Sequence, residues 1–185
     1  MTHLTPQQAA DALRTGGIVA TPTEGVMGLS CDPFDQTAVG RLLALKGRPV
    51  EKGLILVAAG LDQLDGLIDW SALPGERRSH IEADWPGPVT WTLPATPKVP
   101  VWIRGRFPTV AVRVSAHSVM QALCRAFGGP VVSTSANISG QPPALSCEQA
   151  IGSFGEALAG CVKGALGGHA GPTPIYDGLT GTPLR

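Results

Sequence analysis

The sequence predicts a single α/β domain over residues 1–185, built on a mixed sheet flanked by helices. Helix-like and strand-like segments interleave along the chain without strict strand–helix–strand spacing. Hydrophobic residues make up 43% of the chain and charged residues only 15%, which is typical of a chain that folds around a core. We find no internal repeat, linker or low-complexity segment, although 24 Gly and 17 Pro indicate many turns.

The first quarter of the chain predicts a helix, a strand and a second helix. A helix is expected over 6–15, because Thr5 can cap it and Pro6 is tolerated at a first helical position. A short β-prone run at 18–21 follows. Asp35 can cap the next helix, whose apolar side chains share a broad face: Val39, Leu42, Leu43 and Leu45.

The middle of the chain predicts three strands. The apolar run 53–59 indicates a fully buried strand, and weaker helical segments near 60–68 and 74–84 follow it. Segments 89–93 and 110–114 alternate with a period of two. Each of these two strands therefore has one apolar face and one face available for polar side chains.

The last third predicts two helices and two strands. A helix from about 117 to 127 leads into a strand at 130–134. Ser146 and Gln149 form a capping-box pattern that predicts the start of a helix extending to about 159. The pair 175–176 is expected to be a late strand.

Neither a targeting segment nor a cysteine motif is evident. The first residues lack a basic stretch followed by an apolar one, and no apolar run is long enough to cross a bilayer, so a cytoplasmic protein without a membrane anchor is expected. The cysteines lack metal-type or paired spacing and are interpreted as ordinary buried thiols. They are Cys31, Cys124, Cys147 and Cys161.

Charge is unevenly distributed, although the formal net charge is zero. No acidic residue occurs between Asp84 and Glu148, and an anionic ligand could bind along this interval. A sheet-rich segment that carries few surface acids is the simpler interpretation. The basic residues of the interval are Lys98, Arg104, Arg106, Arg113 and Arg125.

The segment Ser133-Thr-Ser-Ala-Asn137-Ile-Ser-Gly140 directly follows a predicted buried strand. Hydroxyls, a carboxamide and backbone N–H groups at the end of a strand suit a phosphate. A capped turn would use the same residue types. The chain has no Walker A or dinucleotide fingerprint, no nucleophile-elbow motif and no zinc-protease motif, so any ATP site must be built differently.

Two further segments carry candidate polar side chains. Lys46 and Arg48 end a predicted helix just before Pro49 and could clamp a phosphate, or could simply pair with the helix C-terminus. Thr23 and Glu24 follow the first predicted strand, where they would face a cleft or begin a capped helix.

Taken together, these segments resemble the YrdC/TsaC family of threonylcarbamoyl-AMP synthases, in its short form without a second domain. Six motifs occur in the family's order and span nearly the whole chain. They are Pro22-Thr-Glu-Gly-Val-Met-Gly28, Lys46-Gly-Arg48-Pro49, Trp85-Pro-Gly-Pro-Val-Thr90, Val110-Ala-Val-Arg113-Val, Ser133-Thr-Ser-Ala-Asn137-Ile-Ser-Gly140 and Asp177-Gly-Leu-Thr-Gly181.

The resemblance implies a twisted mixed parallel and antiparallel sheet with an open, basic, concave surface. It implies a nucleotidyltransferase that makes threonylcarbamoyl-AMP and pyrophosphate from L-threonine, bicarbonate or CO2, and ATP with Mg²⁺. The product would serve N6-threonylcarbamoyladenosine formation next to the anticodon in tRNAs reading ANN codons, through downstream threonylcarbamoyl-transfer enzymes. Direct tRNA or double-stranded RNA binding and a monomer or weak dimer are further expectations.

Roles for individual residues follow from the same resemblance. Lys46 and Arg48 are expected to be catalytic and to bind phosphate and carboxylate groups. ATP binding is further assigned to Thr90, Ser133, Ser135 and Asn137. Thr23, Arg113 and Ser133 are expected to bind threonine and its carboxylate, and Arg113 could do so through a bidentate fork. No protein metal ligands are assigned.

Two other classes of protein remain as alternatives. A non-catalytic module that binds double-stranded RNA or tRNA would also need a basic concave face. However, aromatic residues make up only 5% of the chain and do not interleave with basic ones as stacking platforms would. The carbamoyl-transfer domain of hydrogenase-maturation proteins is similar to the family, but it is accompanied by C-x-x-C segments and additional domains.

Overall fold

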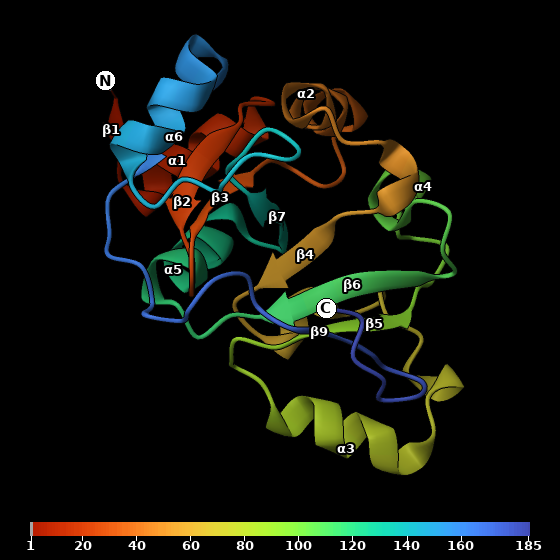
Figure 1. Ribbon diagram of the computed structural model, residues 1–185. Helices are drawn as coiled ribbons and strands as arrows, with labels where there is room; N and C mark the ends of the chain where they lie inside the picture. Colours follow the sequence, from red (N-terminus) through yellow and green to blue (C-terminus); the bar gives the residue numbers. More distant parts are fainter. Residues whose placement is uncertain (1) are drawn as a thin grey trace.

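The computed structural model describes residues 2–185 and contains one nine-stranded sheet within them (Figure 1). The strands are β1 (His3–Leu4), β2 (Val19–Pro22), β3 (Met27–Ser30), β4 (Ile55–Ala58), β5 (Thr90–Pro94), β6 (Thr109–Val114), β7 (Val131–Ser135), β8 (Gly160–Val162) and β9 (Ile175–Asp177). Their spatial order is β1-β8-β2-β3-β7-β4-β6-β5-β9. The pairs β1–β8, β8–β2, β4–β6 and β5–β9 are parallel and the other neighbours are antiparallel, so the mixed α/β sheet is confirmed.

The helices flank this sheet. They are α1 (Pro6–Arg14), α2 (Gln36–Lys46), α3 (Gly75–Ala83), α4 (Val101–Arg104), α5 (Ser118–Phe127) and α6 (Cys147–Phe154). Short 3₁₀ turns lie at Val50–Lys52, Leu61–Leu64, Trp70–Ala72 and Gly155–Ala157. The expected caps are present: Thr5 and Gln8 form a capping box at α1, Asp35 accepts from two N–H groups at α2, and Ser146 caps α6.

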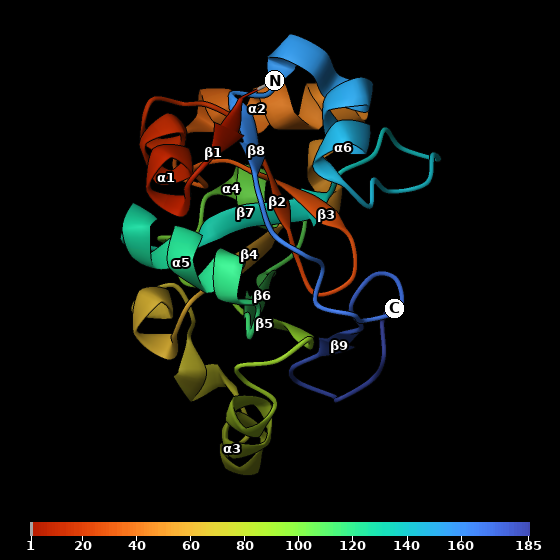
Figure 2. The ribbon, with the colours of Figure 1, turned by 90° about the vertical axis from the view of Figure 1, so that its left-hand side faces the viewer.

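The two faces of the sheet pack against different helices. Adjacent strand residues belong to different clusters, because side chains alternate across a strand: Val131 packs with α1 and α5, whereas Val132 packs with α2 and α6. Figure 2 shows α1 and α5 side by side on one face, with α6 on the other. The helices leave part of the α5 face uncovered further along β4, β6 and β7, and a cavity lies there.

Several element predictions need correction. The helix near 60–68 is only the 3₁₀ turn Leu61–Leu64, and the helix expected to reach 159 ends at Phe154. The chain needs residues after Phe154 to enter β8, a three-residue strand too short to leave a periodic signal. The two-residue strand β1, the four-residue strand β3 and the four-residue helix α4 were also not predicted.

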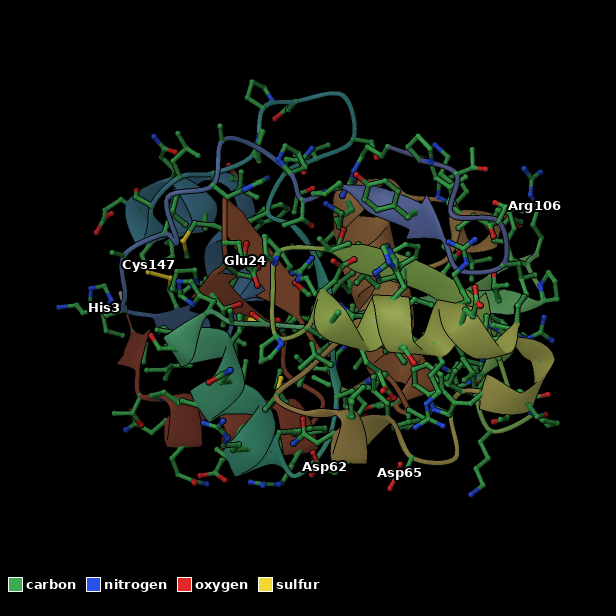
Figure 3. The ribbon with its side chains drawn as sticks, turned by 90° about the horizontal axis from the view of Figure 1, so that it is seen from below. His3, Glu24, Asp62, Asp65, Arg106 and Cys147 are labelled. Carbon is green, nitrogen blue, oxygen red and sulfur yellow. A yellow bond between two sulfur atoms is a disulfide. The ribbon has the colours of Figure 1, made fainter. Side chains whose placement is uncertain are left out.

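The cysteine prediction was half right. Cys31 and Cys124 are buried free thiols, and burial raises the pKa of Cys124 to about 12. Cys147 and Cys161 instead form a disulfide, visible beside the Cys147 label in Figure 3. The first turn of α6 packs beside β8, so the Cα atoms of the two cysteines are 5.8 Å apart, within the range that a disulfide spans. That contact depends on β8, which was not foreseen.

Among residues 2–185, no helix combines the length and apolarity that a membrane crossing requires.

Candidate active site

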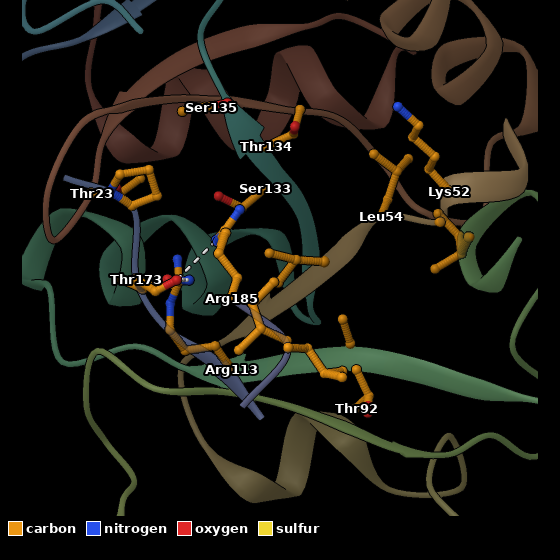
Figure 4. Close-up of a pocket in the computed structure, with 18 of the residues that line it drawn as sticks. Thr23, Lys52, Leu54, Thr92, Arg113, Ser133, Thr134, Ser135, Thr173 and Arg185 are labelled. Atoms are coloured by element: carbon orange, nitrogen blue, oxygen red, sulfur yellow. Dashed lines mark hydrogen bonds between the residues drawn. The ribbon is translucent and has the colours of Figure 1, made fainter. Parts of the chain in front are cut away.

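A cavity of about 430 Å³ lies on the uncovered part of the sheet face that α5 covers elsewhere. Its floor is formed by Ile55 of β4, which is in register with Ala111 of β6 and Ser133 of β7. The chain segments around 23–28, 48–54 and 171–173, together with the C-terminus, form its walls (Figure 4). The alternation expected for 110–114 is confirmed, because Val110, Val112 and Val114 face the core while Arg113 lines the cavity.

The cavity is strongly cationic. Among residues 2–185, five basic residues line it and Asp177 is the one acidic lining residue. Crowding of like charges in a partly buried space favours an anionic ligand. The basic residues are Arg48, Lys52, Arg104, Arg113 and Arg185.

Arg113 is the most deeply buried of these cations, with 4% of its surface exposed. Its Nη1 group donates to the hydroxyls of Thr173, at 2.8 Å, and Thr90, at 3.2 Å. Its Nη2 atom lies 3.3 Å from a carboxylate oxygen of Glu24. Burial lowers the pKa of Arg113, and the charge of Glu24 opposes that shift. Thr90 itself is fully buried and contacts Arg113 rather than lining the cavity.

The hydroxyls expected to bind phosphate lie at the end of β7. Ser133 and Ser135 both line the cavity. Asn137 does not line it and instead shapes the loop: its Oδ1 accepts from the Ser135 hydroxyl at 2.6 Å, and its Nδ2 donates to the main-chain oxygen of Gln141 at 2.8 Å. The loop is therefore a hydrogen-bonded turn whose first hydroxyls face the cavity.

Lys46 is the last residue of α2 and Arg48 lies two residues later, but the two side chains have different surroundings. Lys46 is buried, with 3% of its surface exposed, and does not line the cavity. Its Nζ donates to the main-chain oxygens of Ser135 and, at 2.8 Å, Asn137. Arg48 lines the cavity and is held by two hydrogen bonds to the main-chain oxygen of Gly53, at 2.8 and 3.2 Å. Burial lowers the pKa of both residues.

Thr23 is buried, lines the cavity and lies beneath a segment from the last part of the chain. Its hydroxyl donates to the main-chain oxygen of Val26 at 2.7 Å, and its own main-chain oxygen accepts from Gly167 at 3.0 Å. Segment 165–173 thus lies across the loop that follows β2. This crossing requires Gly25, because a Cβ atom there would lie 2.0 Å from the main-chain oxygen of Gly171.

Sequence reasoning missed several lining residues. Thr173 and Arg185 both lie beside Arg113 in Figure 4, and Arg185 donates to the main-chain oxygen of Thr173 at 2.9 Å. Lys52 and Arg104 also line the cavity. Arg104 belonged to the basic interval noted in the sequence, but no local pattern distinguishes Thr173 or Arg185.

The side chains do not fit a protein-held Mg²⁺ ion. Within residues 2–185, no group of three or more His, Cys, Asp or Glu side chains is placed to hold a metal. The carboxylate of Asp177 accepts from the N–H groups of Leu179 and Thr180, and that of Glu24 is engaged by Ser115 and Arg113. Any Mg²⁺ would therefore depend on ligands from the phosphates of a nucleotide and from water.

The fold and the cavity define an α/β protein with a cationic cavity against one face of a mixed sheet. The Sua5/YciO/YrdC family, described as "Telomere recombination", matches residues 11–184. The chain belongs to this family. It is 51% identical over 179 residues to a threonylcarbamoyl-AMP synthase of Vibrio cholerae, covering 97% of this chain and 95% of the relative. A threonylcarbamoyl-AMP synthase of Stenotrophomonas maltophilia is 50% identical over the full length of both chains.

Solved structures agree on the fold. P. abyssi Sua5 complexed with L-threonine is 34% identical, with a TM-score of 0.86, over 93% of this chain. The match covers 50% of that protein, so this chain spans about half its length. E. coli YciO shares the fold over 97% of this chain, with a TM-score of 0.82 at 24% identity.

Proposed function

We propose that this protein is an L-threonylcarbamoyladenylate synthase, which converts L-threonine, CO2 or bicarbonate, and ATP into threonylcarbamoyl-AMP and pyrophosphate. The observation that carries the proposal is one cationic cavity, in which a buried arginine and several hydroxyls lie close to further basic residues. Identity of about 50% to relatives named threonylcarbamoyl-AMP synthase, over nearly the full chain, supports this reaction. Binding of RNA without catalysis has no comparable support.

The reaction takes two steps in this proposal. The amine of threonine attacks CO2 to give a carbamate with loss of a proton. A carbamate oxygen then attacks the α-phosphorus of ATP, and the bond to pyrophosphate breaks. Neither step needs a side-chain nucleophile, so the protein contributes mainly by holding the reactants in line and by neutralising negative charge.

The threonine end of the cavity is assigned to Thr23, Arg113 and Ser133. Arg113 can donate to the substrate carboxylate because a guanidinium presents paired donors. Its hydrogen bonds to Thr90 and Thr173 and its contact with Glu24 fix its place at the floor of the cavity. Thr90, which was expected to bind ATP, would thus serve threonine indirectly, through Arg113.

The phosphate end is assigned to Arg48 and Ser135. Arg48 and Lys52 face the cavity from the segment after α2, and Ser135 faces it from β7. Lys46 and Asn137 would support ATP binding by fixing the main chain around Ser135. Mg²⁺ would enter as MgATP, as part of the substrate.

The test is pyrophosphate release from ATP with threonine and bicarbonate, omitting each substrate in turn, with the product identified by mass spectrometry. Release that depends jointly on threonine and bicarbonate is expected. The Arg113→Ala variant should lose about 1.5–3 kcal/mol of threonine binding, which is about ten- to a hundredfold. Absence of turnover by a protein that binds RNA in a salt-dependent way would contradict the proposal.

The remaining expectations stay predictions. They are delivery of the product to tRNA threonylcarbamoyl-transfer enzymes, direct contact with tRNA or double-stranded RNA, a monomeric or weakly dimeric state, and a cytoplasmic location.

A further inference from the structure

Glu24 is a buried carboxylate outside the cavity assigned to substrates. It has 6% of its surface exposed. It does not line the main cavity and instead borders a separate one of about 350 Å³, together with His117 and His169. A buried carboxylate is costly unless it is paired, so its position calls for a physical reason.

The carboxylate of Glu24 is fixed from two directions. The Ser115 hydroxyl, just beyond β6, donates to Oε1, and this hydroxyl in turn accepts from the N–H of His117 at 3.1 Å. The main chain of Glu24 is also anchored, because the N–H of His169 donates to its oxygen at 2.9 Å. Glu24 therefore presents its second oxygen, Oε2, at a defined place.

That second oxygen faces Arg113, with Nη2 at 3.3 Å. Within residues 2–185, neither Glu24 Oε2 nor Arg113 Nε has a hydrogen-bond partner. The hydrogen bonds of Arg113 go to two neutral hydroxyls through Nη1 alone, so neither of them holds Nη2. The charge of Glu24 lies beside Nη2 and holds that part of the guanidinium.

We propose that Glu24 is a positioning residue, which holds the Arg113 guanidinium in the orientation that receives the carboxylate of threonine and does not itself contact the substrate. This inference rests on the proposed function, in which Arg113 binds that carboxylate. Because Arg113 lies at the threonine end of the cavity, the effect of Glu24 is confined to threonine and does not extend to ATP.

A competing account predicts the opposite change in threonine affinity. A carboxylate beside Arg113 also competes with the substrate carboxylate for the same positive charge. If competition outweighed positioning, removal of the Glu24 charge would strengthen threonine binding. The direction of the change therefore decides between the two accounts.

The experiment uses Glu24→Gln, which keeps an oxygen acceptor for the Ser115 hydroxyl and removes the charge. Binding of L-threonine and of L-threoninamide, which lacks the carboxylate, is measured by calorimetry, and KM is measured for threonine and for ATP. Threonine affinity should fall about tenfold or more, as expected for a charge-assisted contact, while KM for ATP is unchanged. Preference for threonine over threoninamide should shrink, which a general loss of packing would not produce.

Two more variants complete the test. Ser115→Ala releases one oxygen of the carboxylate without changing any charge, so it should act in the same direction more weakly, and it carries the test if Glu24→Gln does not fold. Glu82→Gln, which removes an exposed ion pair with Arg78 on α3, should change neither KM. Unchanged or tighter threonine binding in Glu24→Gln, or equal rises in both KM values, overturns the inference. Failure of the proposed function would differ, because the wild-type protein itself would then neither bind threonine nor release pyrophosphate.

Discussion

The ammonium group of Lys46 donates a hydrogen bond to the main-chain oxygen of Asn137 at 2.8 Å. It also donates to the main-chain oxygen of Ser135, so the last residue of α2 holds the turn that follows β7. In this arrangement the amino group faces protein oxygens rather than the cavity. In the proposed function, Lys46 would therefore act on the phosphates of ATP through the shape of the loop.

Replacement of Lys46 by methionine should weaken ATP binding selectively. The substitution keeps the length of the side chain but removes hydrogen bonds from a charged donor, each contributing about 1.5–3 kcal/mol. We expect KM for ATP to rise about ten- to a hundredfold, with threonine affinity nearly unchanged. Steady-state pyrophosphate release measures the first quantity and calorimetry the second. Lys98→Met, at an exposed site away from the cavity, is the control, and equal effects of the two substitutions would contradict this role.

The same contact predicts a pH dependence of ATP binding. Burial first, and the charge of Arg48 second, lower the pKa of Lys46 to about 8. The ammonium form that binds the loop is therefore present below about pH 8 and is lost as pH rises through this value. At saturating threonine, KM for ATP should increase above about pH 8 in a titration from roughly pH 6.5 to 9.5. Lys46→Arg stays charged and should show no such step, whereas a flat wild-type profile would refute the assignment.

The parts of the site that the sequence predicted are those governed by local strand geometry. Alternation along 110–114 places Arg113 opposite the valines of the core, and the apolar run before Ser133 indicates a buried strand that ends in hydroxyls. The order of the six motifs supplied Thr23 and Arg48, which also line the cavity. The alternation along one strand is sufficient to predict which face such a side chain occupies, because the strand fixes its direction.

Other parts depend on contacts between distant segments and leave no local signal. Thr173 and Arg185 reach the cavity only because β9 pairs with β5 at the edge of the sheet. The hydrogen bonds of Lys46 join residues about 90 positions apart, as the separations of 89 and 91 residues indicate. Asn137 was expected to touch the nucleotide, but its amide is engaged within its own loop. The residue type alone does not tell whether an asparagine amide contacts a nucleotide or forms hydrogen bonds within its own loop.

Gly28 should control the space at the threonine end of the cavity. A Cβ atom at this lining position would lie 3.0 Å from Thr23 Cγ2 and 3.3 Å from Ser133 Oγ, two side chains assigned to threonine. Gly28→Ala is therefore expected to raise KM for threonine about tenfold, because one methyl group displaces both side chains by a few tenths of an ångström. Pyrophosphate release at varied threonine concentration checks the change.

The matched control for that prediction is Gly40→Ala. Gly40 lies within α2, and a Cβ atom added there would meet no other atom within 4 Å. Alanine stabilises a helix interior by about 0.5–1 kcal/mol relative to glycine, so this variant should melt higher and keep both KM values. A threonine KM that is the same in both variants would show that Gly28 does not limit the space for the substrate.

The disulfide between Cys147 and Cys161 should stabilise the fold. It closes a loop with a sequence separation of 14 and joins α6 to β8. A loop of this size corresponds to about 3 kcal/mol of unfolding free energy, or a Tm change of about 6–12 °C for a chain of this length. Cys147→Ser should lower Tm by that amount, and a thiol reductant should lower the wild-type Tm to the same value without further effect on the variant. Cys31 and Cys124 are free thiols in both proteins, so the comparison reports on the disulfide. Equal Tm values for the oxidised wild type and Cys147→Ser would contradict the prediction.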